Sequence, residues 1–128
     1  PVHFHLGRIL VRADSLAQGI AHYRRAVTLA PDLLEAHYNL GTLLLRLGHA
    51  GEALTHLRQV VRLRPDMAAA HNNLAIALQS AGQFTEAVAE FRRALALRPD
   101  DAEVQANLAR ILARVEASAD LSPNSQSP

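Results

Sequence analysis

The stretch EAHYNLGTLLLRLGHAGEALTHLRQVVRLRP, residues 35–65, decides the fold. Its features return along the chain at a constant spacing of 34 residues, beginning with the Asn39-Leu40 pair, which reappears at residues 73–74 and 107–108. A repeat of this length indicates stacked units, because each small motif buries its apolar face against its neighbours. Further columns with the same spacing are Pro31, Pro65 and Pro99; Leu6, Leu40, Leu74 and Leu108; and Leu10, Leu44, Leu78 and Leu112.

Each period contains two helical patterns. The leucines that follow Asn39 recur at steps of three and four residues up to Leu47, which is the apolar face of an amphipathic helix. Gly48 ends this helix, and a second helix then runs towards Pro65, which cannot continue it. The pattern therefore predicts helices over residues 2–13, 16–29, 34–47, 50–63, 67–81, 84–97 and 101–116.

Acidic residues mark two of the expected helix starts. Asp32 with Glu35, and Asp100 with Glu103, have the spacing of capping boxes. After the last helix the chain reads SADLSPNSQSP, a Ser- and Pro-rich composition that favours disorder. The expected units are a first repeat at 1–33, with more sequence preceding it in the intact protein, a second repeat at 34–66, a third at 67–100, a capping helix at 101–116 and a disordered tail at 117–128.

Composition excludes several classes of function. No apolar run is long enough to span a membrane, and the absence of cysteine excludes disulfides and thiolate zinc sites. A net charge of +1 and an aromatic fraction of 4% argue against nucleic-acid binding. There is no nucleophile elbow, Gly-rich phosphate loop or carboxylate pair of an enzyme, so we expect neither catalysis nor a cofactor. No compartment follows from the sequence.

The stretch at 35–65 resembles a tetratricopeptide (TPR) repeat. It has the Leu40-Gly41 pair, the Gly48 turn, the Glu52-Ala53 pair and the terminal Pro65, and the resemblance extends over residues 2–116. It implies an all-α, right-handed TPR solenoid of three helical hairpins plus a C-terminal capping helix, acting as a protein-protein interaction scaffold. The Asn before Leu is similar to the asparagine-ladder superhelical type, such as the TPR region of O-GlcNAc transferase. One departure is that the family's frequent Trp is replaced by His3, His37, His71 and Gln105, which makes the packing between helices smaller there.

The resemblance places the asparagines on the concave surface that the first helices of TPR repeats line. An uncharged amide donates and accepts hydrogen bonds at once, so it matches the backbone of an extended peptide without requiring one side chain. The alternative is that the asparagines bond between neighbouring helices and contact no ligand. The candidate groove residues are Asn39, Asn73 and Asn107, with Tyr38, Thr42, Asn72, Ile76, Arg8 and Arg110 beside them.

Two family variants lead to different expectations for the ligand. The chaperone-binding TPR clamp uses basic and Asn side chains, but the matching positions here are Phe4, Arg8, Asn39, Ala69 and Asn73, so a chaperone tail is not expected. The module is alternatively a substrate-recruiting arm of a larger enzyme, an idea that rests on family analogy alone.

The first expected helix is apolar around much of its circumference and favours neighbours on both sides. Self-association, giving a homo-oligomer, is therefore an alternative to peptide binding. The candidate residues for this N-terminal face are Val2, Phe4, Ile9 and Val11.

Two periodic columns of charged or titratable residues have structural interpretations. His3, His37 and His71 lie on separate repeats, about 10 Å apart by the packing distance of helices, which is too far for one metal ion. Arg24, Arg58 and Arg92 lie on the second helices, where they solvate the convex side; the alternative is a basic stripe for RNA or an acidic partner.

Overall fold

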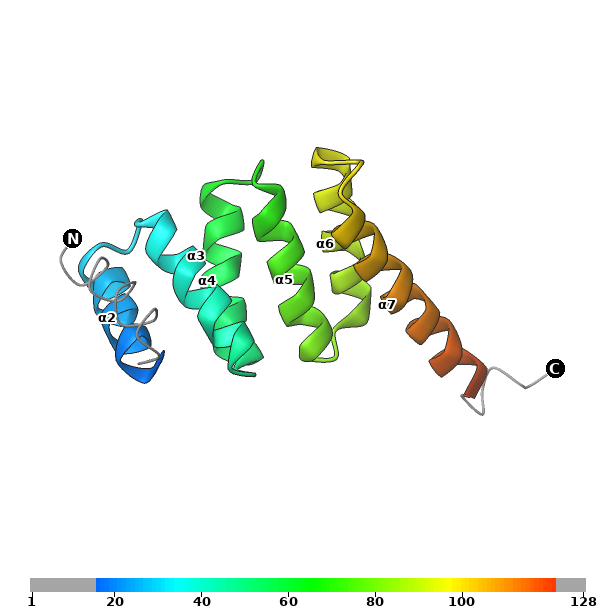
Figure 1. Ribbon diagram of the computed structural model, residues 1–128, viewed down its shortest axis with the longest axis horizontal. Coiled ribbons are helices and arrows are strands. Elements are labelled where there is room, and N and C mark those ends of the chain that lie inside the picture. Colours follow the sequence, from blue (N-terminus) through cyan, green and yellow to red (C-terminus); the bar gives the residue numbers. More distant parts are fainter. Residues whose placement is uncertain (1–15, 122–128) are drawn as a thin grey trace.

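The structure is a computed structural model, and it describes residues 16–121. Within that range the chain forms α-helices joined by short turns, and no β-strand occurs there. Figure 1 shows the helices arranged in one row that ends with α7. The helices are α2 (Leu16–Leu29), α3 (Leu34–Arg46), α4 (Ala50–Leu63), α5 (Ala68–Ser80), α6 (Phe84–Leu97) and α7 (Ala102–Leu121).

The expected all-α repeat architecture is confirmed. Helix α3 packs against α4 and α5 packs against α6, so each pair forms a hairpin. Contacts between α4 and α5 and between α6 and α7 join one repeat to the next. The helix expected at 2–13, which would complete a hairpin with α2, lies outside the described residues.

The core is a continuous apolar layer between the first and second helices of the repeats. Leu40 and Leu44 on α3 are buried against Leu57 on α4, and Leu78 on α5 is buried with Phe91 on α6. Burying one such side chain contributes about 1.5–3 kcal/mol. Because successive hairpins bury the same columns, the period of the sequence becomes the period of the packing.

Glycines with left-handed backbone form the turns inside the two complete hairpins. Gly48 has a φ of 82° and Gly82 has a φ of 80°. At the first turn the Gly48 N–H donates to the Leu45 carbonyl and the His49 N–H donates to the Leu44 carbonyl. This arrangement satisfies carbonyl groups at the end of the helix and is accessible to glycine at little cost. The prediction that Gly48 ends its helix is confirmed.

The helix starts differ from the predicted capping boxes. Leu33 is the N-cap of α3 and makes no side-chain capping bond, so Asp32 does not cap that helix. At α7 the capping side chain is Asp101, whose Oδ1 accepts from the N–H groups of Glu103 and Val104 at 3.1 and 3.3 Å. The turns after Pro65 and Pro99 end one residue later than predicted, and at α7 the capping position moves from Asp100 to Asp101.

Helix α7 also differs from its predicted end at residue 116. It continues to Leu121, because Ala117, Ser118 and Ala119 are compatible with a helix and the first proline comes only at Pro123. Residues 117–121 thus belong to the helix rather than to the tail. None of the helices in the described range is both long and apolar enough to cross a membrane.

Candidate peptide-binding face

Asn39, Asn73 and Asn107 occupy equivalent positions on α3, α5 and α7, each directly before a leucine that faces the core. Consecutive residues point about 100° apart around a helix, so the amide emerges beside the core rather than inside it. All three asparagines are half-buried. We call the side of α3, α5 and α7 that carries them the ladder face.

Asn73 is fixed by the helix of the preceding repeat. Its Nδ2 lies 3.2 Å from the Tyr38 hydroxyl oxygen and 3.4 Å from Thr42 Oγ1, and donates to both. Thr42 Oγ1 in turn donates to the Tyr38 carbonyl at 2.8 Å, which leaves its lone pairs to face the amide. The Oδ1 of Asn73 accepts no hydrogen bond from the residues at 16–121, so this acceptor is oriented but unused.

Asn107 is bonded through both ends of its amide. Its Nδ2 donates to Asn72 Oδ1 at 3.2 Å, and its Oδ1 accepts from Arg110 Nη2 at 2.7 Å. Asn39 has no hydrogen-bond partner among the described residues. By sequence spacing, the positions equivalent to Tyr38 and Thr42 one repeat earlier are Phe4 and Arg8, which lie outside that range.

Two of the three asparagines thus bond to the neighbouring first helix. In both cases the acceptor lies 35 residues earlier, at Tyr38 for Asn73 and at Asn72 for Asn107, which is one period plus one residue. This spacing is present in the sequence, but only the packing of one first helix against the next shows which residues bond. The bonds use amide N–H groups and leave the carbonyl oxygen of Asn73 available.

A hollow of about 240 Å³ opens on the ladder face between α3 and the start of α5. It brings together Tyr38 and Asn39, which the sequence selected, with Leu34, Glu35 and Met67. Leu34 and Met67 were not predicted as site residues, because their exposure depends on where the helices begin.

The remaining predicted residues divide into three groups. Ile76 is half-buried and packs against the core, whereas Arg110 is exposed on α7. Arg8 lies outside the described residues, as do all members of the predicted N-terminal face: Val2, Phe4, Ile9 and Val11.

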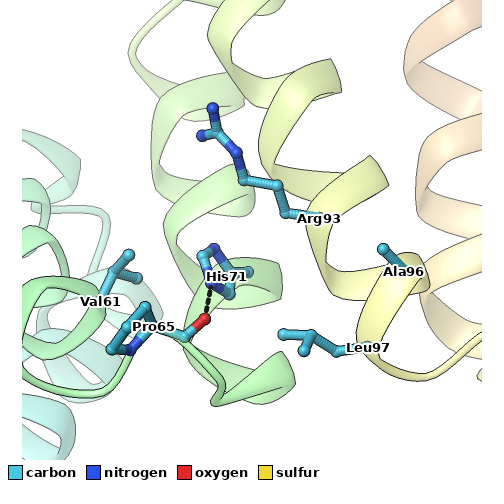
Figure 2. A pocket seen from close by; sticks show the side chains of 6 residues that line it. All are labelled: Val61, Pro65, His71, Arg93, Ala96 and Leu97. Atoms are coloured by element: carbon cyan, nitrogen blue, oxygen red, sulfur yellow. Dashed lines mark hydrogen bonds between the residues drawn. The ribbon is translucent and has the colours of Figure 1, made fainter.

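A second polar column binds each first helix to the turn before it. His37 Nε2 lies 2.6 Å from the Pro31 carbonyl oxygen, and His71 Nε2 lies 2.7 Å from that of Pro65. The dashed line in Figure 2 marks the second of these contacts. Gln105 Nε2 donates to the Pro99 carbonyl at 2.7 Å. His37, His71 and Gln105, which replace the family's Trp, therefore each supply a hydrogen bond to the turn, whereas the sequence had predicted only smaller packing at these positions.

The other ring nitrogen of each histidine meets the second helix of the same hairpin. His71 Nδ1 lies 2.6 Å from Glu90 Oε2, and His37 Nδ1 lies 3.1 Å from His56 Nδ1. Burial lowers the pKa of His56, and the charge of His37 lowers it further, while Glu52 acts in the opposite direction. Within residues 16–121 no group of three or more His, Cys, Asp or Glu side chains is placed to hold a metal ion.

The arginine column connects the second helices of neighbouring repeats. Arg24 on α2 makes two hydrogen bonds to Glu52 on α4, at 2.5 and 2.9 Å, and Arg58 on α4 lies 3.4 Å from Glu86 on α6. The Arg24 bond lowers the pKa of Glu52. From the sequence we predicted that these arginines solvate the convex side, and their partners were not predicted. Glu52 and Glu86 nevertheless have the same spacing in the sequence as the arginines.

Comparison with known proteins places this geometry in context. Sequence profiles described as tetratricopeptide repeat match residues 2–66, 38–102 and 74–120. No protein of curated function matches the sequence.

Several solved structures have a similar fold. MamA 41-end from Desulfovibrio magneticus RS-1 has a TM-score of 0.86 and 22% identity, over 89% of this chain and 64% of that one. MamA MSR-1 C2 has a TM-score of 0.85 and 26% identity, over 98% of this chain and 72% of that one. The first TPR of Spaghetti (RPAP3), bound to the HSP90 peptide SRMEEVD, has a TM-score of 0.84 and 19% identity, over 90% of this chain and 91% of that one. This chain spans 64% of the length of the first of these structures.

Proposed function

Because this chain belongs to the tetratricopeptide repeat family, we propose that it is a protein-interaction scaffold whose ladder face binds an extended peptide segment of a partner. The observation that carries the proposal is the Oδ1 of Asn73, which accepts no hydrogen bond within residues 16–121 and which Tyr38 and Thr42 orient through the amide nitrogen. A backbone N–H of a peptide is the donor that such a fixed acceptor matches. The proposal includes no catalysis by this chain.

The repeat spacing sets the register of the expected ligand. Packed helices lie about 8–10 Å apart, and an extended chain advances about 3.3 Å per residue. Asn39 and Asn73 would therefore contact roughly every third residue of the ligand. The hollow beside Asn39 offers Leu34 and Met67 for an apolar side chain and Glu35 for a polar one. This proposed arrangement would correspond to the asparagine-ladder mode, which the resemblance of the sequence to the repeats of O-GlcNAc transferase implies.

A second candidate function is favoured by the bonds between helices. Asn73 and Asn107 both donate to the preceding first helix, so the column alternatively serves only to hold the stack together. The chain would then be a structural module, or the recruiting arm of a larger enzyme that binds through another surface.

Selection of a ligand from a library of displayed 12-residue peptides, followed by affinity measurement, separates the two functions. Each lost hydrogen bond costs about 0.5–1.5 kcal/mol, and Asn39 and Asn73 supply two such bonds, so replacing Asn39, Asn73 and Asn107 together by alanine should weaken binding by about one to two orders of magnitude if the losses add. N-methylation of the peptide at every third backbone nitrogen should have a similar effect, while methylation at the intervening positions should have little.

The control variant is Gln59→Ala, which removes an amide from α4, away from the ladder face. Circular dichroism shows whether the triple variant keeps its helices. Equal affinity of the helical triple variant and the original chain would exclude the ladder as the binding site and support the structural function.

A further inference from the structure

Helix α7 is equivalent to α3 and α5, the first helices of the preceding repeats. It exposes apolar side chains at positions that are buried in α3 and α5. Leu44 on α3 is 1% exposed and Leu78 on α5 is 0% exposed, but the equivalent Leu112 on α7 is 39% exposed. Ala109 is likewise exposed, whereas the equivalent Ala75 is fully buried. Helix α7 therefore carries the apolar face of a hairpin without the second helix that covers it elsewhere.

The two complete hairpins show what covers this face. In the second repeat Leu57 of α4 approaches Gly41 so closely that a Cβ built there would lie 2.8 Å from Leu57 Cγ. In the third repeat Phe91 of α6 is fully buried at the equivalent position, in the hairpin that contains Ala75. The covering helices share a pattern, in which a small residue is followed four positions later by a large apolar residue. A small or β-branched residue comes three positions after that. The residues are Ala53, Leu57 and Val60 on α4, and Ala87, Phe91 and Ala94 on α6.

A charge accompanies the apolar pattern. Glu52 and Glu86 directly precede the small residues of the covering helices, and each pairs with an arginine on the previous second helix, Arg24 or Arg58. Arg92 on α6 is the next member of that arginine column. It is exposed and has no ion pair or hydrogen bond with the rest of the described chain. A helix placed over α7 in the same way would bring an acidic side chain to Arg92.

The surface between α6 and α7 is also hollowed. Phe84, Val88 and Arg92 of α6 and Leu112 and Val115 of α7 line an open groove of about 420 Å³. Residues 122–128, SPNSQSP, contain no large apolar side chain that would fill it.

We propose that this α6–α7 groove binds an amphipathic helix of a partner protein, in the place that a second helix occupies in the other repeats. In the recognised helix, an acidic residue is followed directly by a small residue. Leu or an aromatic residue stands four positions after the small residue, and a second small residue stands three positions after that. The acid pairs with Arg92, and the large apolar side chain packs over Ala109 and Leu112. This is helix-in-groove recognition, and it uses a surface separate from the ladder face.

A second copy of this chain fits the groove less well. The equivalent pattern on α2 begins with Gln18 instead of an acid, and its large residue, Tyr23, is already buried at 3% exposure. The matching faces of α4 and α6 are buried within their own hairpins. Charge complementarity and availability therefore favour a helix from another protein.

The sequence of α6 is the best probe, because its natural target on α5, Leu74-Ala75 with Leu78, has the same residues as Leu108-Ala109 with Leu112 on α7. We would label a synthetic peptide of residues 83–98, hold it helical with a lactam bridge on its exposed face, and verify its helicity by circular dichroism. Fluorescence polarisation against the full chain should show saturable binding. Leu112→Glu should weaken it at least tenfold, whereas Ala106→Glu on the ladder face should leave it unchanged.

Charge reversal tests the register. Arg92→Glu in the protein, or Glu86→Arg in the peptide, should each weaken binding several-fold, and the two changes together should restore it. Failure of the helical peptide to bind, or binding indifferent to Leu112→Glu, would overturn the proposal. Light scattering provides a further check: a dimer that Leu112→Glu converts to a monomer would assign the groove to a second copy, and the partner-helix proposal would be wrong.

Discussion

His71 Nδ1 lies 2.6 Å from Glu90 Oε2, and both side chains are buried, at 5% and 7% exposure. The other ring nitrogen of His71 faces the Pro65 carbonyl, and Glu90 also bonds Arg93 on its own helix. One imidazole therefore joins α5, α6 and the turn between repeats. Its two nitrogens face a carbonyl oxygen and a carboxylate oxygen, so the ring is held from both sides.

Removing the Glu90 carboxylate should lower the stability of the third repeat. Glu90→Ala leaves His71 Nδ1 buried without its partner, and a lost hydrogen bond to a charged group costs about 1.5–3 kcal/mol. Glu86→Ala, on the same helix, breaks only the exposed pair with Arg58 and should cost about 0–1 kcal/mol. Urea denaturation of both variants measures the two free energies of unfolding, and equal losses would show that burial of the pair contributes nothing.

The second repeat should respond to acid because His56 stands where Glu90 stands in the third. The pKa of His56 is lowered by burial, by His37 and by Arg24, although Glu52 raises it. Since the folded-state pKa lies below the unfolded value of 6.5, the unfolded chain binds more protons between the two values. The stabilisation is present above about pH 6.5 and is lost as the pH falls through the folded pKa.

The measurement is thermal unfolding of the original chain and of His56→Gln between pH 7.5 and 5.0. Glutamine keeps a polar side chain opposite His37 Nδ1 and does not titrate, so the variant should lose less stability on acidification than the original chain. Parallel pH profiles for the two proteins would contradict the assignment of the acid sensitivity to His56.

A methyl group at Gly41 should crowd the core. An added Cβ would meet Leu57 Cγ at 2.8 Å and Leu57 Cδ2 at 3.0 Å, and Leu57 is fully buried. Overpacking costs about 1–3 kcal/mol, while Gly to Ala inside a helix gains about 0.5–1 kcal/mol, so Gly41→Ala should be neutral to destabilising by about 2 kcal/mol.

Gly51→Ala is the matched control for Gly41→Ala. It lies in α4 with nothing within 4 Å of a built Cβ, so the gain in helix propensity of up to about 1 kcal/mol should appear without strain. Denaturation midpoints of the two variants should therefore move apart. If Gly41→Ala stabilises the chain as much as Gly51→Ala does, the close approach of α4 to α3 is not a constraint.

The positions of the helices were predictable from the sequence, because the apolar residues recur with a constant spacing of 34 residues. The turn at Gly48 depends only on residues that are close in the sequence. The bounds of α2, α4 and α6 agree with the prediction. The predicted caps at Asp32 and Asp100 were wrong, because the residue before α3 is Leu33 and the capping side chain of α7 is Asp101, which is a matter of backbone geometry in the turn.

The polar contacts were harder to predict, since each joins residues on different helices. Asn73 and Asn107 were selected from the sequence as a column, but their acceptors depend on how far one helix is shifted against the next. His71 and Glu90 are 19 residues apart in one hairpin, and only the packed pair shows that the histidine column is bonded at both ring nitrogens.

Comparison of Asn73 with Asn39 separates stacking from ligand binding. Asn73 makes two hydrogen bonds to α3, so Asn73→Ala should lower the free energy of unfolding by about 0.5–1.5 kcal/mol. Asn39 has no bond within the described residues, and alanine is the better helix former, so Asn39→Ala should be neutral or stabilising by a few tenths of a kcal/mol. Both variants should nevertheless weaken the peptide selected on the ladder face, because the proposed ligand contacts both amides. Denaturation and fluorescence polarisation on the same samples measure stability and affinity. If stability falls but affinity for the peptide does not, the asparagines serve only the packing between repeats.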